Sequence, residues 1–227
     1  MRASYQKDLK VLSEYIIRGD SFHHLANVVR LRVGEEILLL NGQGLEVRCQ
    51  VDQVSKKEIF LKTLFHEEKT LPYRIDLALG MPKKDALDLS LKQAVELGVH
   101  TCYLVRSSHS QMKLPEADRL QKLLISALEQ SNSPHLTEAV PADFDEIDYT
   151  FYDQVIVLDS QSKGDQRPLG KGKYLLIIGP EGGFSPSELE FFDNVPNLIR
   201  LNLPTPIMRT PTALSCGVGV ILQRLMD

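Results

Sequence analysis

The residues whose types and spacing most suggest chemistry stand in two segments late in the sequence. The first is the run GPEGGF at residues 179–184, which follows the apolar run LLII and precedes the helix-start pattern SPSE. Its three glycines let backbone N–H groups approach a ligand closely. The run has no lysine and carries Glu181 at its centre, so it matches neither the P-loop nor the dinucleotide pattern. It predicts a loop for a cationic or hydroxyl-bearing ligand, with a glycine-rich turn that binds nothing as the alternative.

The second segment is LNLPTPIMRTPTA at residues 201–213. We expect a strand to end at Leu203, and a proline-stiffened loop to lead into a helix with Thr210 as its cap and Pro211 at its first position. Arg209 then stands just before a helix N-terminus, where the positive end of the helix dipole does not favour a cation. This position predicts a role toward an anionic ligand, with an ordinary surface arginine as the alternative.

The elements that must position these segments follow a strand-and-helix alternation from residue 73 onward. Apolar runs predict strands at 75–79, 102–105, 154–158 and 174–178, and helical spacing predicts helices at 86–97 and 116–130. Continuous apolar runs are typical of buried parallel strands. Ligands of such α/β sheets bind beyond the carboxyl ends of the strands, where the loop at 179–184 would lie. The sequence therefore predicts an α/β domain at residues 73–227.

The first 70 residues show a different pattern. Strands are expected at 36–40, at 45–54 and from residue 59, with the turn sequence NGQG at 41–44 between the first two. Apolar residues alternate along 45–51, which is typical of a half-buried strand. Successive strands joined by tight turns predict a small antiparallel barrel or sheet, with a domain boundary near residues 68–72.

The composition limits the classes of protein to which the chain can belong. With 43% hydrophobic and 25% charged residues, the chain has the balance of a soluble globular protein. No apolar run approaches the roughly 20 residues that span a bilayer, and the first residues lead into no apolar signal region. We therefore expect a cytoplasmic protein without a membrane partner. The three cysteines are far apart, which predicts reduced thiols and no metal site.

Charge is unevenly distributed. The net charge of −4 argues against a general nucleic-acid binder. Residues 1–72 nevertheless hold 11 Lys/Arg against 10 Asp/Glu, and the run HHLANVVRLR at 23–32 contains no acidic residue. This run predicts a local basic patch for phosphates, with a solvated helix-to-strand segment as the alternative.

Six segments in order resemble one known family. HHLANVVRLRVGEE at 23–36 resembles its "HHL..VLR...GD" start, and MPKK at 81–84 with KQAVELGV at 92–99 resembles its "K.tELGV" helix. RSS at 106–108 occupies the place of the family's "ERS" motif. EQS at 129–131 resembles "EQS/EQC", and residues 203–213 resemble "LG.RILRTETA". IGPEGGF at 178–184 matches in full. Over nearly its whole length the chain thus resembles the RsmE family, bacterial enzymes that methylate N3 of a uridine in 16S ribosomal RNA.

This resemblance implies a fold, a cofactor and partners. RsmE enzymes belong to the SPOUT class, so residues 73–227 would form an α/β trefoil-knot methyltransferase domain, and residues 1–70 a PUA-like RNA-binding β-barrel. S-adenosyl-L-methionine would bind in the knot, 16S ribosomal RNA of the small subunit would be the substrate, and the chain would form a homodimer. No base for the reaction is identified.

The resemblance also implies site residues. The expected cofactor-binding residues are Leu158, Gly179, Pro180, Glu181, Gly182, Leu201, Leu203, Pro204, Ile207, Met208, Thr210 and Ala213. Arg209 and Arg106 are the candidates for stabilising charge in catalysis. His24, Arg30, Arg32 and Arg106 are the candidates for contacts with RNA.

The sequence departs from the family pattern at three places. Asn132-Ser133 replaces the usual glycine-arginine, residues 204–206 replace a glycine and an arginine, and Pro211 replaces a glutamate. Two alternative functions therefore stay open. One is a SPOUT methyltransferase for another site in ribosomal or transfer RNA, including a ribose 2′-hydroxyl. The other is a catalytically inactive RNA-binding factor in ribosome assembly.

Overall fold

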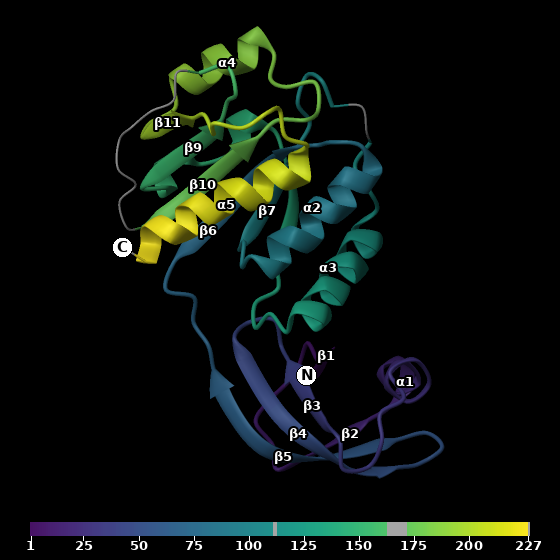
Figure 1. Ribbon diagram of the computed structural model, residues 1–227. Helices are drawn as coiled ribbons and strands as arrows, with labels where there is room; N and C mark the ends of the chain where they lie inside the picture. Colours follow the sequence, from purple (N-terminus) through teal and green to yellow (C-terminus); the bar gives the residue numbers. More distant parts are fainter. Residues whose placement is uncertain (111–112, 163–171, 227) are drawn as a thin grey trace. The chain divides into compact units, whose positions relative to one another are not determined.

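The computed structural model describes residues 1–110, 113–162 and 172–226. The chain folds into two compact units (Figure 1). The first comprises Met1–Thr70 and Ile125–Leu136, and the second comprises Leu71–Leu124 and Thr137–Asp227. The segment 125–136 belongs to the first unit although it follows residue 70, which the periodicity of the sequence does not indicate.

The first unit is built on a five-stranded sheet in the order β1-β3-β4-β5-β2. Its strands are β1 (Arg2–Tyr5), β2 (Glu14–Ile17), β3 (Glu36–Leu40), β4 (Leu45–Val54) and β5 (Ile59–Glu68). The strands predicted at 36–40 and 45–54 are confirmed with those bounds. The expected antiparallel barrel is not closed, because β1 and β2 are the two edges of the described sheet and β1 runs parallel to β3. The unit is therefore an open, mixed sheet.

The core of the first unit lies on one face of this sheet. Alternate β4 residues from 45 to 51 are at most 8% exposed, as their periodicity predicts. Phe22 of α1 (Gly19–His23), Leu25 of the π-helical turn η1 (His24–Val28) and Leu31 after it belong to the same buried cluster. The run at 23–32 therefore buries its leucines and directs its cationic side chains to the surface.

The end of α3 (Ala117–Ser131) also belongs to the first unit. Glu129 accepts a hydrogen bond from the backbone N–H of Tyr5 at 2.8 Å. The next residue after the helix, Asn132, has a φ of 54°. Glycine adopts this left-handed conformation most easily, and asparagine is the next best choice. The replacement of glycine by Asn132 thus keeps the turn that ends this helix.

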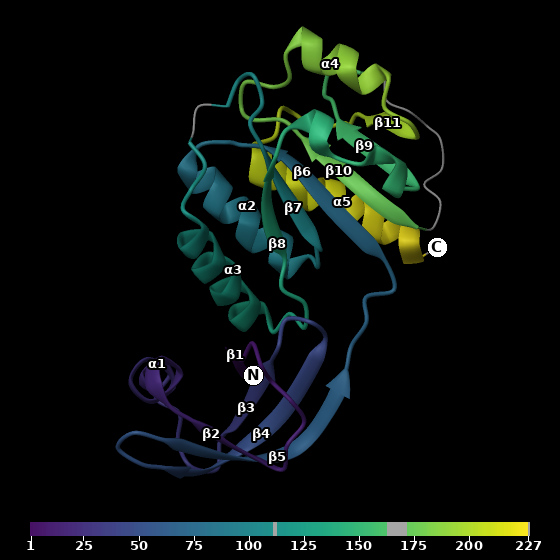
Figure 2. The same ribbon diagram turned by 180° about the vertical axis from the view of Figure 1, so that it is seen from behind.

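In its described residues the second unit is an α/β layer structure with six parallel strands in the order β11-β9-β10-β6-β7-β8. The strands are β6 (Arg74–Gly80), β7 (Thr101–Val105), β8 (Glu138–Ala142), β9 (Gln154–Leu158), β10 (Lys173–Ile178) and β11 (Leu198–Leu201). Its helices, besides the start of α3, are α2 (Lys84–Glu96), α4 (Pro186–Asp193) and α5 (Thr210–Met226), with 3-10 turns η2 (Phe144–Glu146) and η3 (Tyr149–Phe151). Helices α2 and α5 pack together on one face of the sheet (Figures 1 and 2).

The predicted elements of this unit are confirmed, with two differences. The strand expected to end at Leu203 ends at Leu201, so the loop before α5 is longer than expected. Strand β8 was not predicted, because its sequence EAVPA is mostly exposed at the edge of the sheet and contains Pro141. The glycines and the proline of residues 160–172 predict an exposed loop, and this stretch falls largely outside the described residues.

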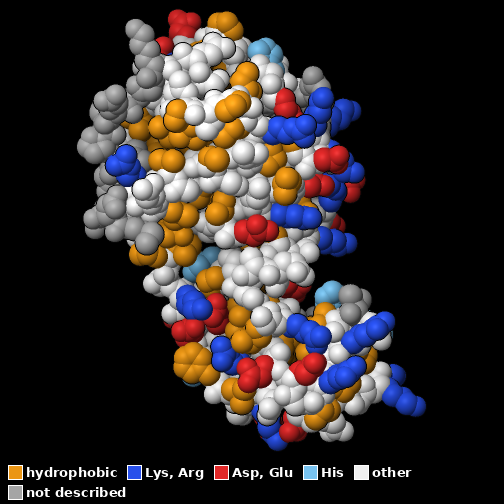
Figure 3. Space-filling model, viewed as in Figure 1, with side chains coloured by type: hydrophobic (Ala, Val, Ile, Leu, Met, Phe, Trp, Pro, Cys, Tyr) orange, Lys and Arg blue, Asp and Glu red, His pale blue; other side chains and the backbone are white. Residues whose placement is uncertain are grey.

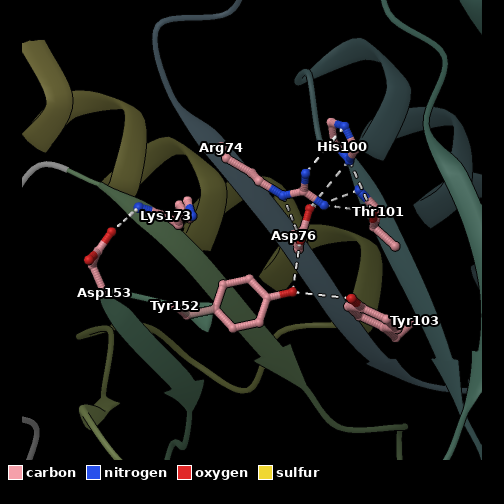
Figure 4. Close-up of polar contacts among 8 residues, drawn as sticks. All are labelled: Arg74, Asp76, His100, Thr101, Tyr103, Tyr152, Asp153 and Lys173. Atoms are coloured by element: carbon pink, nitrogen blue, oxygen red, sulfur yellow. Dashed lines mark hydrogen bonds and ion pairs between the residues drawn. The ribbon is translucent and has the colours of Figure 1, made fainter. Parts of the chain in front are cut away.

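A buried carboxylate connects the amino-terminal ends of the central strands (Figure 4). Asp76 of β6 has no exposed surface. One of its oxygens accepts from the backbone N–H of Thr101 in β7 at 3.0 Å, and the other accepts from Arg74 Nε at 3.0 Å and from the Tyr152 hydroxyl at 2.8 Å. Because Tyr152 directly precedes the segment that enters β9, these bonds fix the starts of three strands relative to one another.

The Tyr152 hydroxyl is able to donate a hydrogen bond in this cluster because it stays protonated. Burial, the hydroxyl of Tyr103 at 3.3 Å and the charge of Asp76 together raise the pKa of Tyr152 far above its usual value. The carboxylate therefore has a neutral donor on one side and the Arg74 guanidinium on the other, which satisfies a charge that would otherwise be costly to bury.

We predict that Asp76→Ala lowers the free energy of unfolding by about 3–5 kcal/mol, because it leaves a partly buried guanidinium, a buried N–H and the Tyr152 hydroxyl without their acceptor. The control is Asp52→Ala, which removes an exposed ion pair with Lys62 and should cost about 0–1 kcal/mol. Urea unfolding followed by circular dichroism measures both. Equal losses in the two variants would contradict the importance of the Asp76 cluster.

Candidate functional site

A pocket lies at the carboxyl edge of the sheet in the second unit. Strands β9, β10 and β11 are neighbours and end at Leu158, Ile178 and Leu201, and each continues into a loop that borders the pocket. The lining residues are Leu158, Asp159, Ser160, Gln161, Ile178, Gly179, Pro180, Glu181, Gly182, Gly183, Phe184, Leu189, Leu201, Asn202, Leu203, Thr205, Pro206, Ile207, Met208, Thr210 and Ala213. Parallel pairing brings the two segments singled out in the sequence to one place.

The glycine-rich loop has a defined turn. The N–H of Gly183 donates to the carbonyl of Pro180 at 2.9 Å, and Gly183 has a φ of 70°, which glycine adopts without strain. Phe184 then packs into an aromatic cluster with Phe144 and Phe192, with the ring centroids of Phe184 and Phe192 5.0 Å apart. This cluster anchors the end of the loop, so its backbone is held beside the pocket.

Helix α4 begins directly after this loop with the predicted capping box. The Ser185 hydroxyl accepts from the N–H of Glu188, and the Glu188 carboxylate accepts from the N–H of Ser185 at 2.7 Å. The same carboxylate also accepts from the N–H of Ser108, in the loop after β7, at 2.8 Å. Burial alone would raise the pKa of Glu188, but the backbone hydrogen bonds from Ser185 and Ser108 outweigh it and hold the pKa below its usual value.

An ion-pair cluster supports a further part of the pocket wall. Arg200 in β11 donates to Asp159 at 2.9 Å, to Asp193 at the end of α4 at 2.6 Å, and to the carbonyl of Leu189 at 2.9 Å. Asp159 lines the pocket, and its carboxylate is mostly buried. Arg200 thus joins the end of β9 to α4 and neutralises the acidic side chain in the pocket wall.

The predicted residues fall into three groups. All of the expected cofactor-binding residues line the pocket except Pro204, which is exposed and outside the lining set. Arg106 and Arg209 are exposed and do not line the pocket, although Arg209 stands between the lining residues Met208 and Thr210.

The third group is in the first unit, where the expected RNA-contacting residues His24, Arg30 and Arg32 are all exposed. Lys and Arg side chains gather there over the region of α1 (Figure 3). The pocket and this basic surface therefore belong to different units of the chain.

Sequence reasoning missed Arg200 and the ion pair that it forms with Asp159. A signal for Arg200 was present, because an arginine inside the short apolar strand LIRL needs a buried partner. Asp159, the first residue after the apolar run VIVL, is the partner that the structure supplies.

Among the described residues, no group of three or more His, Cys, Asp or Glu side chains is arranged to hold a metal ion. Within the same residues, no helix has the length and apolar character needed to cross a membrane.

Fold and site together define an α/β protein with a ligand pocket at the carboxyl edge of a parallel sheet. Residues 69–222 match the family described as RNA methyltransferase domain, and residues 17–64 match the family described as RNA methyltransferase PUA domain. The chain therefore belongs to the RNA methyltransferase family.

Relatives and solved structures agree with this family. The chain is 28% identical to ribosomal RNA small subunit methyltransferase E of Bacillus subtilis, over 88% of this chain and 86% of the relative. It is 29% identical to ribosomal RNA small subunit methyltransferase E 2 of Borreliella burgdorferi, over 94% and 93%. The fold resembles that of the Neisseria gonorrhoeae methyltransferase E solved with bound S-adenosyl methionine, with a TM-score of 0.82, 24% identity, and coverage of 98% and 97%.

We predict that Arg200→Leu lowers the free energy of unfolding by about 1.5–3 kcal/mol, because hydrogen bonds to charged groups are lost and Asp159 is left mostly buried without its cation. Arg18→Leu is the control, since Arg18 forms an exposed pair with Glu58 and should have little effect. Urea unfolding of the two variants checks this. An Arg200→Leu protein as stable as the Arg18→Leu protein would show that the ion pairs are dispensable.

Proposed function

We propose that the protein uses S-adenosyl-L-methionine to methylate N3 of a uridine in 16S ribosomal RNA of the small ribosomal subunit. The observation that carries this proposal is the pocket formed by three strand-end loops inside the segment that matches the methyltransferase family. The names of the curated relatives support the choice of ribosomal RNA.

The lining of the pocket suits this cofactor. Leu158, Ile178, Leu203, Met208 and Ala213 supply apolar surface for a purine ring. The turn at 179–183 supplies backbone groups that can bind the polar parts of a nucleoside. When bound, S-adenosyl-L-methionine supplies a methyl group activated by a sulfonium.

The chain must then position a uracil ring and stabilise the charge that develops on it. The imide nitrogen becomes nucleophilic only as its proton leaves, so a nearby cation would lower the barrier. Arg209 and Arg106 are our candidates for this role. Both are exposed and so are accessible to RNA.

The first unit is proposed to hold the RNA. Residues 17–64 match a PUA domain of RNA methyltransferases. The exposed side chains of His24, Arg30 and Arg32 provide positive charge for phosphates. In this proposal residues 1–70 bind RNA and residues 73–227 carry the reaction, in the cytoplasm where ribosomal subunits are assembled.

We further propose that the second unit has the trefoil knot of the SPOUT class and that two copies pair through α5. No charged side chain occurs between residues 210 and 223. Thr212, Cys216, Gly219 and Gln223 nevertheless follow one helix face that is exposed or half-buried. Hydrophobic side chains also reach the surface over α5 (Figure 3). A surface helix normally carries charge on its exposed face, so an uncharged face supports burial against a second copy.

The proposed activity is tested with small subunits from a strain that lacks the modification. We expect the protein to bind S-adenosyl-L-methionine in calorimetry and to transfer one methyl group to a uracil base of 16S RNA, located by mass spectrometry. Arg209→Ala should lower kcat by about 100-fold with unchanged cofactor affinity, while Arg224→Ala, an exposed arginine near the end of α5, should have no effect.

The other outcomes separate the alternatives. Methyl groups on ribose or only on transfer RNA would reject the uridine-N3 assignment. If calorimetry detects no binding of S-adenosyl-L-methionine but 16S RNA binds tightly, the result favours an inactive assembly factor.

The proposed dimer is tested with Gly219→Arg. A side chain at Gly219 meets no atom within 4 Å, so the substitution should leave the single chain folded while placing a charge on the uncharged face. We expect sedimentation to show a dimer for the unchanged protein and for the control Gln121→Arg, which alters an exposed residue of α3, but a monomer for Gly219→Arg. Equal masses for all three would refute pairing through this face.

A further inference from the structure

One carboxylate beside the pocket holds two loops at once, and the proposed function assigns it no role. Glu188 is the third residue of α4 and completes that helix's capping box. Its second oxygen accepts from the backbone N–H of Ser108, 80 positions earlier in the chain. A capping glutamate needs only the bond within its own helix, so the bond to Ser108 is an additional feature.

Residues 106–110 form a compact turn that packs on the glycine-rich loop. The N–H of Ser110 donates to the carbonyl of Ser107 at 2.9 Å, which closes the turn around Ser108 and His109. The His109 ring nitrogen Nδ1 lies 3.1 Å from the carbonyl oxygen of Gly183. That carbonyl can only accept, so Nδ1 is the donor and carries a proton.

The fit between this turn and the pocket loop is close. A Cβ added at Gly182 would lie 2.9 Å from the Cβ of His109, which is too near for two carbon atoms. Gly182 and Gly183 both line the pocket. The turn at 106–110 therefore lies directly behind the pocket wall, and its position depends on the bonds made by Glu188 and His109.

We propose that Glu188 is a positioning residue for RNA recognition: it fixes the turn of Arg106 and His109 against the pocket loop, so that both side chains meet the target strand in one defined place. This inference rests on the proposed function, because it assumes that RNA presents a base to this pocket. Without the bond to Ser108, the turn keeps its sequence and charge but is held less firmly, by the His109–Gly183 bond and by the contact between the Ser108 and Ser185 hydroxyls.

Glu188→Gln separates this role from simple helix capping. The amide keeps one acceptor oxygen, but its NH2 group cannot accept from a second N–H, so one of the two loops is released. The start of α4 is retained, because Pro186 and the bond from the N–H of residue 188 to the Ser185 hydroxyl are unchanged. If this variant does not fold, Glu188→Asp replaces it, since the shorter carboxylate cannot span both donors.

The matched control is Glu146→Gln. Glu146 is also a capping-box glutamate of the second unit, and its carboxylate accepts from the N–H of Asp143 at 2.8 Å at the start of η2. The control thus removes the same charge from the same kind of capping box, but its single bond can be kept by the amide oxygen, and its 3-10 turn does not line the pocket.

The experiment compares the two variants with the unchanged full-length protein by three measurements. Amide hydrogen exchange of a peptide covering residues 104–110 should increase in Glu188→Gln only. The dissociation constant for a 16S RNA fragment, and KM for it in the methylation assay, should rise about tenfold, whereas affinity for S-adenosyl-L-methionine should change less than twofold.

Unchanged exchange at 104–110 would overturn the inference, as would RNA affinity equal to that of Glu146→Gln. A loss of cofactor affinity equal to the loss for RNA would also overturn it, because Glu188 would then act on the pocket alone. If the unchanged protein binds RNA but transfers no methyl group, the proposed activity fails while exchange and RNA binding still decide the role of Glu188.

Discussion

The second unit depends on a carboxylate that has no contact with water. Asp76 sits in the central strand β6, and burying its charge is tolerable only if cationic and neutral donors surround it. Those donors come from β6 itself, from the start of β7 and from the residue pair before β9. The amino ends of the strands are thereby held in one register, and since all the strands run in the same direction, their carboxyl ends are aligned as well. The pocket lies at that aligned edge, so its shape depends on polar contacts at the far end of the sheet.

Around the pocket, the backbone conformation of the loop and the charged side-chain contacts have different roles. Glycine and the aromatic cluster of Phe184 determine the path of the loop at 179–184. Arg200 supports the wall made by β9 and α4, and Glu188 joins α4 to the turn after β7, which packs behind the glycine-rich loop. Each of these ionised side chains thus bonds to at least two separate segments. Such groups restrict the loops without filling the space that a ligand needs.

Much of this arrangement follows from the sequence because it depends on local patterns. Apolar runs located β9 and β10, the alternation along 45–51 located β4, and the SPSE signal located the start of α4 and its capping box. Leu201 and Leu203 were placed in the site by the resemblance to the RsmE family. Contacts across the sequence were harder. The partners of Arg200 and Glu188 come from segments 41 and 80 positions away, and no periodicity encodes them. Strand β8 lies exposed at an edge and contains Pro141, so it lacks the apolar signature of its neighbours, and the parallel pairing of β1 with β3 joins strands more than 30 residues apart.

The assignment of residues 125–136 to the first unit has a consequence for how this gene can evolve. The first unit is discontinuous: its sheet comes from the first 70 residues, but Leu128, which is fully buried, comes from the segment 125–136 in the second half of the chain. A single recombination event near codon 70 would transplant the sheet without that segment and break the hydrogen bonds that Gly42 and Gly44 make with Leu136 and Pro134. The two units are thus unable to be exchanged as independent modules, and substitutions in the sheet and in residues 125–136 should be selected together.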